Sequence, residues 1–98
     1  MSSNQVILNG TIVELDALRH TPAGIPILKF RIAHESAQTE SGTERKVGCE
    51  IAAVAFEREA KLAATMPLGS AVTVTGFLER KGRSSRTLVL HAKQIEFN

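Results

Sequence analysis

Apolar and polar side chains alternate along several segments of this chain, which predicts β-strands that bury one face. The clearest segment alternates three apolar residues with two cations: Leu28, Phe30 and Ile32 with Lys29 and Arg31. A period of two places the apolar set in a core and the cations on a solvated face. Similar segments predict four further strands, at residues 5–18, 45–56, 71–80 and 87–97.

Turn and loop residues separate these strands. Pro22 and Gly24 predict a tight turn, because proline fixes φ at one corner and glycine allows a positive φ at another. Gly10 lies inside the first strand, which predicts a bulge or a close approach of a neighbouring backbone. The polar stretch 36–44 predicts a loop. Cys49 shares the parity of the apolar residues of its strand, so we expect a small buried hydrophobe.

Residues 57–66 depart from this alternation. They are mostly strong helix formers, and Pro67 ends the run, which predicts a short helix that depends on tertiary packing. The expected order is three strands, one helix and two strands. This order indicates an all-β fold with one short helix, the OB-fold, which is a five-stranded Greek-key barrel. At 98 residues, the chain is expected to form a single OB-fold domain over 1–98.

Composition and charge narrow the class of protein to which the chain can belong. Hydrophobic residues make up 43% of the chain and charged residues 22%, as in ordinary globular proteins. The formal net charge of +2 is too small to indicate nucleic acid by itself, but residues 1–79 carry −2 and residues 80–98 carry +4. One cysteine excludes an intramolecular disulfide. A polar N-terminus and a longest apolar run of six residues predict a cytoplasmic protein without a membrane span.

The basic segment near the end of the chain concentrates four cations in seven residues, with no acid among them: Arg80, Lys81, Arg83 and Arg86. Unpaired cations are too costly to bury, so the segment must project into solvent. It is either a solubilising loop or a loop that contacts phosphates. In the OB-fold it connects the fourth and fifth strands, where ligands commonly bind, and this favours phosphate contact.

Five further cations map to the surface that the OB-fold uses for binding: Arg19, Lys29, Arg31, Arg45 and Lys46. Singly, each is more often a solvated strand residue; together they suggest a positive track that leads to the 80–86 loop. Among the four phenylalanines, Phe30 is expected in the core, and Phe77 could be core, dimer contact or exposed. Phe56 is the best candidate for stacking on bases, the alternative being packing under the helix.

No catalytic or metal-binding constellation is predicted. His20, His34 and His91 are far apart in the sequence, and none has a partner at metal-ligand spacing. We therefore expect a binding protein that is not an enzyme and uses no metal or cofactor.

Five segments together resemble the bacterial primosomal replication protein N (PriB) family: residues 6–11, 21–26, 34–36, 74–78 and 88–96. The more specific ones read Thr-Pro-Ala-Gly-Ile-Pro and Leu-Val-Leu-His-Ala-Lys-Gln-Ile-Glu. The resemblance implies an OB-fold homodimer that binds single-stranded DNA and assists replication restart with the PriA helicase and other primosome proteins. It also implies DNA contacts by basic residues of the binding strands and loop, namely Arg19, Arg45, Arg80, Lys81, Arg83 and Arg86.

The chain departs from the family's best-known members at three positions. Gly48 and Thr43 stand where those members have aromatic residues, and Glu35 stands where they have a basic residue. Base stacking contributes on the order of 1–3 kcal/mol per base, so we expect weaker binding that depends mainly on charge. The alternative is a protein–protein adaptor of the same fold, which docks the restart helicase and has little DNA affinity of its own.

Overall fold

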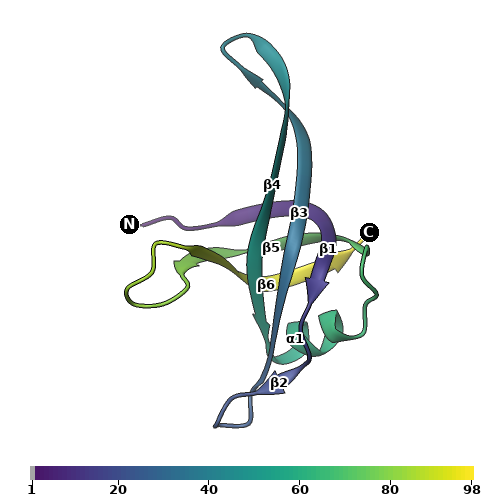
Figure 1. Cartoon of the computed structure of the whole chain (residues 1–98), viewed down its shortest axis with the longest axis vertical. Coiled ribbons are helices and arrows are strands. Elements are labelled where there is room, and N and C mark those ends of the chain that lie inside the picture. Colours follow the sequence, from purple (N-terminus) through teal and green to yellow (C-terminus); the bar gives the residue numbers. More distant parts are fainter. Residues whose placement is uncertain (1) are drawn as a thin grey trace.

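Six strands and one helix follow one another in the computed structural model, which describes residues 2–98 (Figure 1). The elements are β1 (Val6–Leu15), β2 (Arg19–His20), β3 (Pro26–Glu40), β4 (Thr43–Phe56), α1 (Glu57–Ala64), β5 (Ala71–Arg80) and β6 (Leu88–Phe97). The predicted order of five strands and one helix is confirmed. The short β2 was not predicted, and β1 and α1 end earlier than expected.

The strands close into a barrel. Their order is β1-β5-β6-β4-β3-β2, and a further pairing between β1 and β3 completes the circle. Thr11 stands at the crossover, because it pairs with Ala71 of β5 and with Ala33 of β3. The register of β1 against β3 shifts between Ile12 and Glu14, so a bulge bends β1 as it changes partner. The closed five-stranded barrel with one helix is the predicted OB-fold.

Gly10 lies just before this crossover, where β1 passes close to β3. A Cβ atom built on Gly10 would lie 2.2 Å from the carbonyl oxygen of Ala33 and 2.7 Å from a side-chain carbon of Ile32. Only a residue without a side chain fits there. The predicted close approach of a neighbouring backbone is therefore confirmed at this position.

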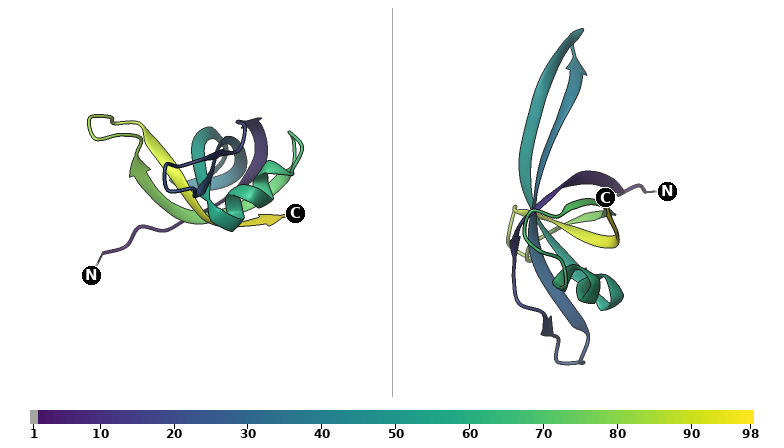
Figure 2. Two further views of the ribbon diagram at one scale, coloured as in Figure 1. Left: turned by 90° about the horizontal axis from the view of Figure 1, so that it is seen from below. Right: turned by 90° about the vertical axis from the view of Figure 1, so that its right-hand side faces the viewer.

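The core fills the barrel interior. Leu28, Phe30 and Ile32 are buried, as the alternation in this segment predicted. Ala60 and Ala63 of α1 are fully buried against the sheet, and small side chains allow this close contact. The helix lies toward the opposite end of the molecule from the tip of the β3–β4 hairpin (Figure 2).

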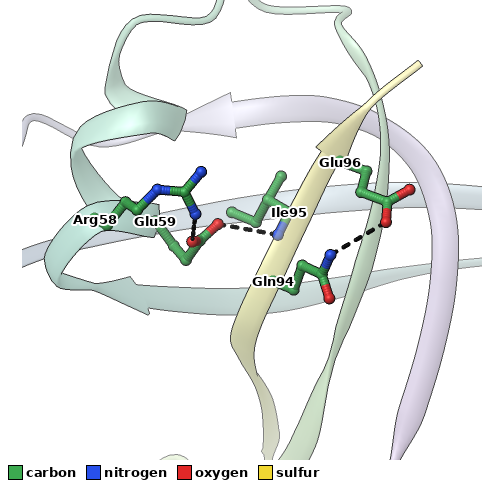
Figure 3. Close-up of polar contacts among 5 residues, drawn as sticks. All are labelled: Arg58, Glu59, Gln94, Ile95 and Glu96. Carbon is green, nitrogen blue, oxygen red and sulfur yellow. Dashed lines mark hydrogen bonds and ion pairs between the residues drawn. The ribbon is translucent and has the colours of Figure 1, made fainter.

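A buried carboxylate joins α1 to β6 (Figure 3). Oε2 of Glu59 accepts a hydrogen bond from the backbone N–H of Ile95 at 3.1 Å, and Oε1 lies 2.8 Å from Nη1 of Arg58. β6 pairs with β4 only as far as Ala92, so beyond that point a side chain takes the place of a strand neighbour. Glu59 thereby satisfies a backbone donor that would otherwise lie unpaired beside the helix.

The hairpin of β3 and β4 extends well beyond the barrel (Figure 1). We call residues 34–49 the hairpin arm. Its strands pair as far as Glu40 and Thr43, and Ser41 and Gly42 form the turn with φ of 52° and 76°. The predicted loop at residues 36–44 is therefore wrong. The segment is polar because both faces of the arm meet solvent, and polarity alone does not distinguish such a strand from a loop.

Cys49 is exposed, and the prediction of a buried residue there is wrong. It faces His34 across the hairpin arm, outside the barrel. Nδ1 of His34 hydrogen bonds the backbone carbonyl of Asn9 at 2.7 Å, and Nε2 hydrogen bonds Oγ of Ser36 at 2.8 Å. Cys49 does lie on the same face of β4 as the buried residues Ala53 and Ala55. That face is covered by the core only as far as Ile51, and from there to the tip of the hairpin arm it meets solvent.

Candidate nucleic-acid interface

An open groove of about 770 Å³ crosses the outer face of the barrel. Its floor is formed by β3, β4 and β6. The end of β1 and the start of the 81–87 loop border it. Its lining includes the cations Lys29, Arg31, Arg80 and Lys81 and the rings of Phe56 and His91.

Strand register explains how residues distant in sequence meet in this groove. Lys29 pairs with Val54, Val54 pairs with His91, and His91 pairs with Phe77. Directly paired residues point to the same face of a sheet, so these four side chains form a row across β3, β4, β6 and β5. The outward face predicted for Lys29 thus continues over four neighbouring strands of the sheet.

Four of the predicted cations line the groove, namely Lys29, Arg31, Arg80 and Lys81. Two acids line it as well. Nε of Arg31 lies 2.8 Å from Oε2 of Glu14, so this cation already has a partner. Asp16 lies at the same end of β1 and also contributes to a smaller hollow with Arg19 and Lys29. The groove therefore remains positive on balance, with its free cations at Lys29, Arg80 and Lys81 among the lining residues.

The loop between β5 and β6 is held by its own hydrogen bonds. The backbone N–H of Lys81 donates to the carbonyl of Thr87 at 2.8 Å, and that of Ser85 donates to Gly82 at 3.1 Å. Nη1 of Arg80 donates to the carbonyl of Arg83 at 2.9 Å. Arg83 and Arg86 are exposed on this loop but do not line the groove itself. The loop projects from the barrel (Figure 1), and its first residue, Lys81, lines the groove.

Two further predicted cations lie outside the groove. Arg45 and Lys46 belong to the hairpin arm, and Nε of Arg45 lies 3.0 Å from Oε1 of Glu40. Both are exposed, and neither lines the groove. A strand bound in the groove would have to continue along the arm to reach them.

The rings of Phe56 and His91 line the groove. Phe56 is 38% exposed and lines the groove, which favours a surface role over the alternative of packing under the helix. Phe77 is half-buried, and its ring stacks on that of His91. The sequence did not single out His91, because a lone histidine carries no motif. Only the register of β6 against β4 and β5 reveals its place in this row.

No group of three or more potential metal ligands from His, Cys, Asp and Glu occurs among residues 2–98. Within the same residues, no helix is both long and apolar enough to cross a membrane.

Comparison with known proteins points to one family. A family model described as another single-strand binding protein family matches residues 4–94. The replication restart protein PriB of Nitrosomonas europaea is 41% identical over 93 residues, which cover 95% of this chain and 86% of that protein.

Solved structures of similar fold point to the same family. The structure of PriB from Ralstonia solanacearum superposes with a TM-score of 0.90 at 30% identity, and the match covers 99% of both chains. The wild-type single-stranded DNA binding protein of Thermus aquaticus gives a TM-score of 0.78 at 28% identity, covering 98% of this chain and 50% of that one.

Proposed function

Because this chain belongs to the PriB family of single-strand binding proteins, we propose that it binds single-stranded DNA in the groove and assists replication restart. Its relatives are DNA-binding and replication restart proteins, and this chain is not an enzyme. The same membership supports a role in bacterial DNA replication, and hence a place in the cytoplasm.

One observation carries the proposal. The exposed ring of Phe56 lies in a groove lined by the cations Lys29, Arg80 and Lys81. OB-folds bind nucleic acid on this face, beside the loop that here carries Arg83 and Arg86. Proteins that hold single strands without sequence preference combine a positive groove for phosphates with aromatic rings for bases. Both components are present in this groove.

Charge supplies most of the proposed affinity. Gly48 and Thr43 lie on the hairpin arm, so the arm lacks the aromatic rings that the best-known family members carry there. Glu35 pairs with Gly48 and adds a negative charge to the arm. Basic residues therefore have the larger share in binding: Arg19, Lys29, Arg31, Arg45, Lys46, Arg80, Lys81, Arg83 and Arg86.

The direct test is a titration of labelled oligo-dT followed by fluorescence anisotropy at several salt concentrations. Binding to single strands through phosphates gives a slope of log K against log salt of about −0.7 per phosphate neutralised. Micromolar or tighter binding at low salt with such a slope is expected. Absence of binding even at low salt contradicts the proposal and favours the adaptor, which docks the restart helicase without holding DNA.

We further propose that the chain acts as a homodimer with the PriA helicase and other primosome proteins as partners. The barrel leaves strand edges open along the first half of β1 and along the arm, and Ile7 on β1 is 66% exposed. Open edges with exposed apolar side chains are typical sites of chain–chain contact. Light scattering coupled to gel filtration tests the dimer, and surface plasmon resonance against immobilised PriA tests the partner.

A further inference from the structure

Three rings stand almost parallel on the outer face of the barrel. The rings of Phe77 and His91 have centroids 4.9 Å apart and an interplanar angle of 12°. The rings of His91 and Phe56 have centroids 6.3 Å apart and an angle of 19°. We call Phe77, His91 and Phe56 the ring ladder, which runs from β5 over β6 to β4.

The ring ladder is built by strand pairing rather than by sequence proximity. Phe77 and His91 are direct partners in the register of β5 and β6. Val54 is the partner of His91 on β4, and Phe56 lies two residues further along that strand, on the same face. Cross-strand aromatic pairs of this kind hold each other in place.

Two of the three rings are open to a ligand. Phe56 and His91 line the groove, whereas Phe77 does not line it and stacks on His91. The His91 side chain is 23% exposed. Its Nε2 lies 3.2 Å from Oε2 of Glu79, which restricts rotation of the ring. The His91 ring is therefore held by two neighbours, Phe77, which stacks on it, and Glu79, which contacts its edge.

We propose that the ring ladder acts as one base-stacking unit, in which Phe56 and His91 contact nucleobases and Phe77 is a positioning residue for His91. This inference rests on the proposed binding of single-stranded DNA in the groove. A ring that is already fixed loses little conformational entropy when a base stacks on it. Lys29, Arg80 and Lys81 lie around the ladder in the same groove, where they can hold the phosphates of the stacked nucleotides.

The test separates contacts to bases from contacts to phosphates. We compare an oligo-dT with an abasic strand of the same length, for the full-length wild type and for His91→Ala, His91→Phe and Phe56→Leu. His91→Ala is expected to weaken oligo-dT binding about 5- to 10-fold and to leave abasic binding unchanged, since stacking requires a base. His91→Phe keeps an aromatic ring in the ladder and is expected to stay within about twofold of the wild type.

A double-substitution cycle tests whether the rings act together. The loss from His91→Ala is expected to be smaller when Phe56→Leu is already present, because the two rings belong to one unit. His20→Ala removes an exposed histidine that does not line the groove and serves as the matched control.

Two results overturn the proposed stacking role of the ring ladder. In the first, His91→Ala weakens binding to oligo-dT and to the abasic strand equally; in the second, it changes binding to neither oligonucleotide although the wild type binds. Failure of the wild type to bind either strand rejects the proposed function, and the inference with it. If His91→Ala does not fold, as judged by circular dichroism, His91→Phe against His91→Leu gives the same comparison.

Discussion

Nε of Arg31 lies 2.8 Å from Oε2 of Glu14, so a cation and a carboxylate of the groove neutralise each other in the free protein. Both side chains remain partly exposed, at 38% and 67%. Exposed pairs of this kind contribute little to stability, typically about 0.2–1 kcal/mol. In the proposed mode of binding, Glu14 therefore competes with DNA phosphate for Arg31.

Replacing Glu14 with Gln is expected to raise the affinity for oligo-dT about two- to fivefold at low salt, because it frees Arg31 for phosphate. Anisotropy titrations measure this change. Glu96→Gln removes one equal charge from β6, outside the groove, and controls for the net charge of the protein. An equal gain in both variants would mean that the overall charge matters and the Glu14–Arg31 pair does not.

Arg83 and Arg86 test the role of the basic loop. Both are exposed and neither lines the groove, so the double variant Arg83→Ala/Arg86→Ala should keep the stability of the wild type. If each contacts one phosphate, the salt slope becomes shallower by about 1.4. The control is Lys61→Ala, which removes an exposed cation from α1. An unchanged slope would show that neither Arg83 nor Arg86 contacts a phosphate.

The core strand and the basic loop could be predicted from the sequence, because each leaves a local signal in the chain. Leu28, Phe30 and Ile32 revealed the core because period-two alternation is a local signal that needs no knowledge of neighbours. The basic loop was recognisable for a similar reason, since a run of unpaired cations cannot be buried.

Other features depend on which strands lie side by side, and no local pattern encodes that. The environment of Cys49 depends on where the barrel ends along β4, and the place of His91 depends on the registers of β4, β5 and β6. The ion pair of Arg31 with Glu14 likewise follows from the antiparallel pairing of β1 with β3, which places the two residues opposite each other. The alternation in this segment predicts a solvated cation at Arg31, whereas the fold places the carboxylate of Glu14 beside it.

The carboxylate of Glu59 is expected to stabilise the junction of α1 and β6. Glu59→Ala removes the acceptor for the backbone N–H of Ile95 and should lower the free energy of unfolding by about 1–3 kcal/mol. Glu59→Gln retains an acceptor oxygen of the same reach and should cost less. Urea denaturation measures both values. Equal losses for the two variants would show that the negative charge, rather than the hydrogen bond, stabilises the junction.

Gly10 is expected to tolerate no side chain. Because a Cβ there would lie 2.2 Å from the carbonyl oxygen of Ala33, Gly10→Ala must push β1 away from β3. Overpacking of this kind costs about 1–3 kcal/mol or more, visible as a lower midpoint in urea. Gly48→Ala is the matched control, since its Cβ would make only ordinary contacts, the nearest at 3.5 Å. Equal stability of the two variants would contradict the close approach at Gly10.

Gly48 offers the sharpest test of how this chain binds DNA. It lies on β4 with the same parity as Phe56, and a side chain there has room, because the nearest atoms to a Cβ are at 3.5 and 3.8 Å. Gly48→Trp is expected to raise the affinity for oligo-dT by about 1–3 kcal/mol, the contribution of one stacked base. The salt slope should stay the same, because stacking neutralises no phosphate.

Two controls show whether the Gly48→Trp side chain stacks on a base. Gly48→Leu adds apolar bulk without an aromatic face, so it should raise the affinity much less than Gly48→Trp does. An abasic strand should bind Gly48→Trp and the wild type equally well. If the tryptophan leaves oligo-dT affinity unchanged, a bound strand does not pass along the arm, and the contacts proposed for Arg45 and Lys46 are lost with it. If affinity rises while the slope is constant, the strand leaves the groove along the arm, and this chain binds more weakly there because it lacks the ring.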